Sequence, residues 1–286
     1  MIRHLIRMGA AIALLAVCMF LPFLPGEYDG LAVTLSSMSQ VFGMAGLLLV
    51  PLGAIWLAHE YRRRTKQSDT GSSWNWGYLF GLASIGAATL VAVVVSLPAF
   101  INVGPSLGLG VIALWACCAA RLVNRLKGLE RSEHRTFNAS PMYLVVVPIV
   151  VAILRSTLVG PAIEYSRNRA IENSARLISD IERYHEANGH YPPSLLSVWK
   201  DYKPAVKGVE QYLYEPNGEA YNLYFEHLTS QLDTREIVMY NKRDEHEMTS
   251  HAMDLLVLTP PELAVQRGYY AVLDAARPHW KRFLFD

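Results

Sequence analysis

The chain has 286 residues and carries 26 Lys and Arg against 25 Asp and Glu, so its formal net charge is +1. Hydrophobic residues make up 52% of it and charged residues 18%, which excludes a disordered chain. Three cysteines are too few for a disulfide-stapled mini-protein, and the lack of a basic excess gives no support for a nucleic-acid partner.

Five long apolar runs occupy the first 159 residues, and each is close to the roughly 20 apolar residues that a bilayer-spanning helix needs. The runs cover Leu5–Leu24, Val41–Ala58, Trp76–Phe100, Val103–Ala120 and Pro141–Val159. The alternative, a set of buried core helices in a soluble protein, is disfavoured by the charged boundaries of the runs. We therefore predict a membrane all-α bundle of five transmembrane helices. Its first run is expected to be a retained anchor rather than a cleaved signal peptide.

The distribution of Lys and Arg between these runs predicts their orientation. Basic residues gather before the first run, between the second and third, and between the fourth and fifth, whereas Pro25–Gln40 and Asn102–Ser106 contain none. Short cytoplasmic loops are the ones enriched in Lys and Arg. Residues 1–140 are thus expected to form a four-helix transmembrane region with basic cytoplasmic loops and a cytoplasmic N-terminus. Residues 141–159 are the fifth helix, which leads into a domain, residues 160–286, on the far side of the membrane.

In residues 160–286 the periodicity changes from that of a helix to that of strands. Apolar residues recur at helical spacing from Ala170 to Tyr184, and Asn188-Gly189 predicts the end of the helix. Asn217-Gly218 between two aromatic-rich segments predicts a hairpin. The predicted strands are Tyr212–Tyr214, Ala220–Phe225, Arg235–Tyr240, Asp254–Leu258 and Tyr269–Leu273. The expected fold is an α+β domain in which a long helix packs on a small antiparallel sheet.

The segment Ile178–Leu195, which reads ISDIERYHEANGHYPPSL, resembles the type IV pilin and type II secretion pseudopilin domain. In that family a long N-terminal helix runs into a loop of this pattern and then into a β-hairpin, and the resemblance covers about residues 141–228. It implies a structural role for the residues that shape the loop, namely Tyr184, Gly189, Tyr191, Pro192 and Leu195. No prepilin-type cleavage pattern precedes Pro141. A pilin-like domain on a polytopic anchor is therefore expected rather than a subunit of a polymerising fibre.

Candidate chemical groups are few. His185 and His190, like His246 and His251, are five residues apart, so they do not share a helix face as the histidines of a metalloprotease pair do. Surface histidines are the favoured interpretation. Arg155, a charge within the fifth run, is expected to snorkel to the lipid headgroups, with an intramembrane function as the alternative. We predict no catalytic, cofactor-binding or metal site.

The leading hypothesis is a polytopic inner-membrane protein of a Gram-negative-type bacterium that presents a non-catalytic pilin-like interaction domain to the periplasm. Its expected partners are the lipid bilayer and an envelope protein, in an envelope or secretion-like assembly. One alternative is a small-molecule transporter or membrane enzyme with an accessory outer domain, and the other is a ligand sensor. Gly77–Gly81 and Gly104–Gly108 have small-residue spacings that favour packing within the bundle, with homo-oligomerisation as a minority alternative.

Overall fold

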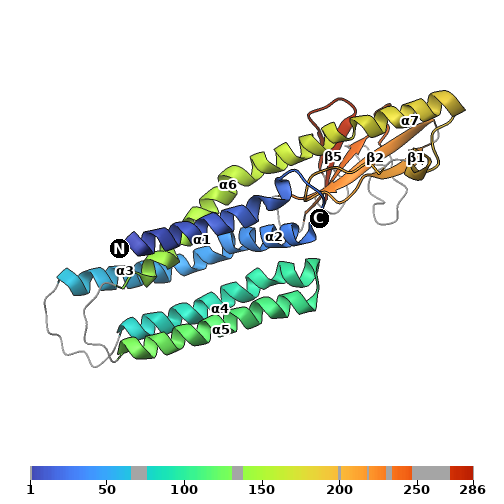
Figure 1. Ribbon diagram of the computed structural model, residues 1–286. Helices are drawn as coiled ribbons and strands as arrows, with labels where there is room; N and C mark the ends of the chain where they lie inside the picture. The colour runs from blue at the N-terminus through green and yellow to red at the C-terminus, as the bar shows by residue number, and fades with distance from the viewer. Residues whose placement is uncertain are drawn as a thin grey trace. The chain divides into compact units, whose positions relative to one another are not determined.

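The computed structural model describes residues 2–65, 76–130, 138–198, 201–217, 219–229, 234–246 and 271–285. The described part is mostly helical, with five long apolar helices and a C-terminal antiparallel sheet of five strands (Figure 1). It divides into two compact units. The first consists of Met1–Leu21 and Gly30–Leu158, and the second of Pro22–Asp29 and Val159–Asp286.

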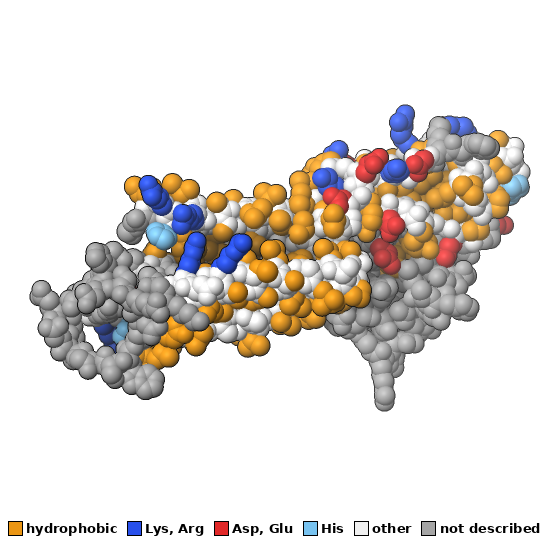
Figure 2. Space-filling view, turned by 60° about the horizontal axis from the view of Figure 1, so that its bottom comes forward, with side chains coloured by type: hydrophobic (Ala, Val, Ile, Leu, Met, Phe, Trp, Pro, Cys, Tyr) orange, Lys and Arg blue, Asp and Glu red, His pale blue; other side chains and the backbone are white. Residues whose placement is uncertain are grey.

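The first unit is a set of helices that expose apolar side chains. Its helices are α1 (Ile2–Phe20), α2 (Gly30–Ala45), α3 (Val50–Thr65), α4 (Trp76–Asn102), α5 (Pro105–Glu130) and the first part of α6 (Ser140–Asn173). Leu90, Ile101 and Leu114 are among the exposed large residues, and apolar side chains cover much of the helical surface in Figure 2. Soluble monomers rarely expose apolar patches of this extent. A lipid environment accommodates them.

Five helical segments of the described chain are long and apolar enough to cross a bilayer. They cover Ile2–Phe23, Gly30–Arg62, Trp76–Asn102, Pro105–Leu126 and Ser140–Asn188. Each contains one of the predicted runs or most of it. The run predicted at Val41–Ala58 begins earlier than expected, because α2 already starts at Gly30, within the segment that was taken as a loop.

The early start of α2 buries small polar side chains that the predicted run left out. Ser36 Oγ donates a hydrogen bond to the carbonyl oxygen of Met19 at 2.5 Å, and Gln40 Nε2 donates to Ser36 Oγ at 3.2 Å. Thr34 Oγ1 donates to the carbonyl oxygen of Gly30 at 2.9 Å. The Ser36 bond joins α2 to the end of α1, as polar side chains join neighbouring helices in membranes, whereas the other two bonds lie within α2. Polar side chains at the start of α2 are thus accommodated in the helix. Because these residues lower the local hydropathy, hydropathy alone places the start of the helix too late.

Two glycines let α4 and α5 approach closely. A Cβ atom on Gly81 would lie 2.7 Å from a Leu126 side-chain carbon, and one on Gly108 would lie 2.3 Å from the Phe100 ring. These distances leave no room for a larger residue without a shift of the facing side chain. Gly81 and Gly108 therefore act in the packing of this helix pair.

The second unit is built on an antiparallel sheet with the strand order β1-β2-β3-β5-β4. The strands are β1 (Leu213–Asn217), β2 (Ala220–His227), β3 (Arg235–Tyr240), β4 (Ala271–Asp274) and β5 (Trp280–Phe285). The second part of α6 and α7 (Ala175–Asn188) pack on one face of the sheet, and a short 3₁₀ turn (Leu195–Val198) follows them (Figure 1).

The predicted strands agree with this sheet in part. The strand at Arg235–Tyr240 has the predicted bounds, and the hairpin of β1 and β2 is present. Its turn is displaced, because Pro216 and Asn217 lie in β1 and Asn217 pairs with Ala220. The strand predicted at Tyr269–Leu273 corresponds to β4, whereas Asp254–Leu258 lies outside the described residues. The sequence analysis missed β5.

The apolar core of the second unit lies between the helices and the sheet. From the helices, Ala170, Ile171, Leu177 and Ile181 are buried against the sheet. From the sheet, the buried residues include Tyr221, Leu223, Phe225, Val238 and Trp280. The predicted apolar helix face is therefore confirmed, and Tyr221, Leu223 and Phe225 share the helix-facing side of β2. A turn at Ser174 separates α6 from α7, where a single helix was expected.

The link between α1 and α2 belongs to the second unit. Backbone N–H groups of Gly26 and Asp29 donate to the carbonyl oxygens of Ala205 and Lys207 at 3.1 and 2.9 Å. In return, the N–H groups of Lys207 and Gly208 donate to the carbonyls of Leu24 and Pro22 at 3.1 and 2.7 Å. A sequence reading has no signal for this pairing, because its partners are far apart in the chain.

Candidate functional site

The residues of the predicted pilin-like loop hold the end of α7 against the sheet. Gly189 follows α7 with φ +76°, a left-handed conformation that glycine adopts without strain, and its N–H donates to the carbonyl oxygen of His185 at 2.8 Å. The Tyr191 ring stacks on His185 at a centroid distance of 4.2 Å. Pro192 is buried, and its carbonyl oxygen accepts a hydrogen bond from Tyr214 Oη at 2.8 Å.

The two remaining predicted loop residues are half-buried. Tyr184 contacts the His190 ring edge-on at a centroid distance of 5.8 Å, and Leu195 packs against the apolar core. All five predicted residues thus lie at the β1–β2 hairpin end of the helix–sheet interface. Their described contacts are packing contacts and hydrogen bonds that fix the loop.

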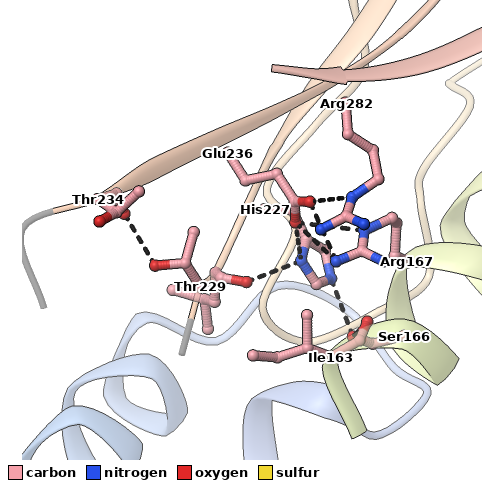
Figure 3. A network of polar contacts seen from close by, with 9 residues as sticks. Ile163, Ser166, Arg167, His227, Thr229, Thr234, Glu236 and Arg282 are labelled. Atoms are coloured by element: carbon pink, nitrogen blue, oxygen red, sulfur yellow. Dashed lines mark hydrogen bonds and ion pairs between the residues drawn. The ribbon is translucent and has the colours of Figure 1, made fainter. Parts of the chain in front are cut away.

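A network of polar side chains, buried except for a partly exposed arginine, lies at the opposite end of this interface, and Figure 3 shows its contacts. It consists of Ser166 and Arg167 from α6, His227 from β2, Glu236 from β3 and Arg282 from β5, and is called the charged cluster below. Paired strand residues point to the same face, and His227 pairs directly with Glu236. The face that is apolar at Leu223 and Val238 therefore becomes charged at its end.

Glu236 is the centre of the charged cluster. Its Oε1 accepts from Arg282 Nε at 2.5 Å and lies 3.0 Å from Arg167 Nη2, while its Oε2 accepts from Arg167 Nε at 3.2 Å. His227 Nδ1 lies 3.2 Å from the same Oε2. Only 1% of Glu236 and 6% of Arg167 are exposed to solvent. The carboxylate is thus fully occupied by cationic and imidazole donors.

His227 connects the strands of the cluster to α6 through its two ring nitrogens. Nδ1 faces two acceptors, the Leu228 carbonyl oxygen at 2.9 Å and the Glu236 carboxylate. Nε2 lies 2.9 Å from Ser166 Oγ, whose proton is donated to the carbonyl oxygen of Ile163. The imidazole thus holds β2, β3 and α6 together within the cluster.

The cluster strongly favours an ionised Glu236. Burial alone raises the pKa of a carboxyl group, but the hydrogen bond and charge of His227, together with Arg167 and Arg282, outweigh it and hold the pKa of Glu236 at about 2. Two arginines then face one buried carboxylate. The charged cluster therefore carries an excess of positive charge.

The lowered pKa of Glu236 predicts an acid-sensitive second unit. A carboxyl group with a depressed folded-state pKa stabilises the fold above its unfolded pKa of about 4.5, and this stability is lost as the pH falls toward about 2. We expect a loss of about 3 kcal/mol from this group over that range. Hydrogen exchange of β2 and β3 peptides in the detergent-solubilised chain measures it. The same titration with Glu236→Gln, which cannot ionise, should lack this component; an unchanged pH profile in the variant contradicts the assignment.

A pocket of about 610 Å³ adjoins the charged cluster. It lies between α6, the ends of β2 and β3, and strands β4 and β5, with Arg167, Glu236 and Arg282 in its wall. Its size is within the range of small-molecule sites. Glu164, Asn168 and Asp274 also line it, so the pocket combines cationic, anionic and amide groups.

The described residues contain no group of three His, Cys, Asp or Glu side chains arranged to hold a metal ion. His246 is buried, its Nε2 lies 3.2 Å from the His279 carbonyl oxygen, and burial lowers its pKa. It is therefore not the surface histidine that was expected. His251 lies outside the described residues.

The charged cluster and its pocket were missed by the sequence analysis. The available signal was the break in strand alternation, since Glu236 and Arg282 occupy positions on the helix-facing side where apolar residues are expected. Comparisons with protein-family models, curated proteins and solved structures find no match to this chain.

Proposed function

We propose that this chain is an integral protein of a bacterial inner membrane that presents its second unit in the periplasm as a non-catalytic, pilin-like recognition module. Five long apolar helices support the membrane anchor. The Lys and Arg residues of the connecting segments support a cytoplasmic N-terminus. The expected partner is another envelope protein, as in a secretion-like assembly.

The pairing of the α1–α2 link with the second unit is the observation that supports an even number of crossings between these two segments. Pro22–Asp29 follows the first apolar segment, and the bulk of the second unit follows the fifth. Segments joined by backbone hydrogen bonds are expected on the same side of a bilayer, which supports an arrangement in which the first and fifth crossings end on one side. Five alternating crossings give this arrangement. A shared side for the α1–α2 link and the second unit also agrees with the charge distribution, which assigns both segments to the outer side.

The pilin-like assignment rests on local architecture. A long helix, a glycine-ended loop and an antiparallel hairpin follow one another in the order that the resemblance implies. The loop residues are used for packing, which suits a scaffold for recognition.

A reporter experiment tests the orientation. An enzyme reporter that is active only in the periplasm is fused after Asp286 in one strain and after Lys127 in another, with a cytoplasm-active reporter at the same sites as the matched control. We expect activity of the periplasmic reporter after Asp286 and of the cytoplasmic reporter after Lys127. Periplasmic activity at Lys127 would overturn the proposed topology and, with it, a periplasmic recognition module.

The ligand-sensor alternative gains support from the pocket beside the charged cluster, because a recognition module without a ligand has no need for a polar cavity lined by a buried arginine and a partly exposed one. The transporter alternative gains no comparable support from the described spans, whose buried polar side chains on α2 are used in packing.

A further inference from the structure

The pocket exists because one helix cannot cover a five-stranded sheet. A helix is about 10 Å wide and neighbouring strands are about 4.8 Å apart, so a single helix covers two or three strands. The core contacts of α6 and α7 are with β1, β2, β3 and the start of β5. Leu273 on β4, which pairs with Arg282 on the same face, is 43% exposed. Beside α6, the β5–β4 part of this face is therefore open.

The inner wall of the pocket presents Arg282, a partly exposed cation with unused donors. Arg282 has a described partner only at Nε, where it donates to Glu236, so its two terminal nitrogens have no partner among the described residues. Arg167 lines the same pocket, uses Nε and Nη2 on the same carboxylate, and is nine-tenths buried. Two guanidinium groups share one buried carboxylate, and Arg167 is almost fully buried, so the inner side of the pocket favours an anionic group on a ligand.

The outer wall presents the opposite charge. Glu164 on α6 and Asp274 at the end of β4 line the pocket, and the charge of Glu164 acts on Arg167. Glu164 is exposed and lies one helical turn before Arg167. Asn168, the next residue on this side of α6, adds an amide that can both donate and accept. The pocket is therefore cationic on its buried side and anionic at its rim.

We infer that this pocket binds a small aminocarboxylate, an amino acid or a short peptide. Its carboxylate accepts hydrogen bonds from the terminal nitrogens of Arg282, and its ammonium group faces Glu164. A planar carboxylate fits the fork of a guanidinium group, which is the strongest pairing available to these donors. The inference goes beyond the proposed function and is independent of membrane orientation, since binding is measured on the solubilised chain.

The test uses three tripeptide probes, two of which lack one charged group of the third, and free alanine, which keeps both charged groups but is shorter. Tri-alanine, tri-alanine C-terminal amide, N-acetyl-tri-alanine and free alanine are titrated by calorimetry into the full chain purified in detergent. We expect tri-alanine to bind, and the amide and acetyl forms to bind at least about tenfold more weakly, because each loses one charge-assisted contact. Comparison with free alanine separates the two sources: equal or tighter binding of alanine assigns an amino acid, and tighter binding of tri-alanine assigns a peptide.

Two variants assign the contacts. Arg282→Met should lose the preference for a free carboxylate and keep the preference for a free amine, whereas Glu164→Gln should do the reverse. Arg183→Met and Glu172→Gln, which change exposed ion-paired residues outside the pocket lining, are the matched controls and should bind as the unaltered chain does. If the unaltered chain binds neither tri-alanine nor alanine, or binds all tri-alanine forms equally, the inference is overturned. Since that comparison needs no variant, a folding defect of Arg282→Met cannot obscure it.

Discussion

Replacing Glu236 with leucine should destabilise the second unit by about 3–5 kcal/mol, the range measured when one partner of a buried ion pair is removed. The reason is the charge that remains. Arg167 is 6% exposed and directs Nε and Nη2 at the Glu236 carboxylate. When this carboxylate is removed, the Arg167 guanidinium group stays buried without its anionic partner. Arg282, whose side chain is 24% exposed, can reach solvent more easily and adds less to the loss.

A double variant separates charge from packing. In the Glu236→Leu, Arg167→Leu chain both buried charges are absent, so a substantial part of the lost stability should return, as when buried ion pairs are replaced by apolar residues. The coupling between the two changes should exceed about 1 kcal/mol, since the residues are in direct contact. Denaturant-dependent hydrogen exchange of peptides from β2 and β3 reports the free energy of unfolding of this unit in the full chain.

Glu172→Leu is the matched control for this series. Glu172 also pairs with an arginine, Arg277, at 2.8 Å, but both side chains are more than half exposed. An exposed pair of this kind contributes about 0–1 kcal/mol, so the variant should remain close to the unaltered chain. If Glu236→Leu cost no more than Glu172→Leu, the cluster would not be a buried ion network, and the acid sensitivity expected for Glu236 would fail with it.

The elements that sequence reasoning found are those with a short-range signal. Apolar runs of about the length needed to cross a bilayer located the five long apolar helical segments of the described chain. The helical spacing of Leu177 and Ile181 identified the face of α7 that packs on the sheet. The Asn188-Gly189 pair located the end of α7, because only the left-handed geometry of a C-cap explains a glycine there. Strand β3 was found because Ile237, Val238 and Met239 form a continuous apolar run.

The elements that sequence reasoning missed are stabilised by contacts with residues far away in the sequence. Strand β5 carries Lys281 and Arg282 in its middle, so no alternation of apolar and polar residues marks it. Arg167 and Arg282 lie 69 and 46 residues from Glu236, and no local pattern connects them. The start of α2 was hidden by serines whose hydroxyl groups find acceptors in helix packing, as Ser36 does with Met19. In each case tertiary contacts satisfy groups that look unfavourable in isolation.

Replacing Phe225 with alanine should also destabilise the second unit by about 3–5 kcal/mol, because removal of a fully buried ring loses its transfer free energy and leaves a cavity. Phe225 is 0% exposed, and its ring lies 6.0 Å from that of Tyr212 and 5.9 Å from that of Trp280, measured between centroids. It therefore joins β2 to the start of β5 beneath the helices.

The control for Phe225→Ala is Leu196→Ala, a change at a side chain that is 87% exposed, which should alter stability by no more than about 0.5 kcal/mol. Hydrogen exchange shows whether the helices and the sheet of the second unit unfold together or separately. If α6, α7 and the sheet unfold together, Phe225→Ala should raise exchange in α7, β2 and β5 peptides by the same free energy. An increase confined to β2 would contradict a single cooperative core and would mean that the charged cluster is held by α6 independently of the aromatic end of the sheet.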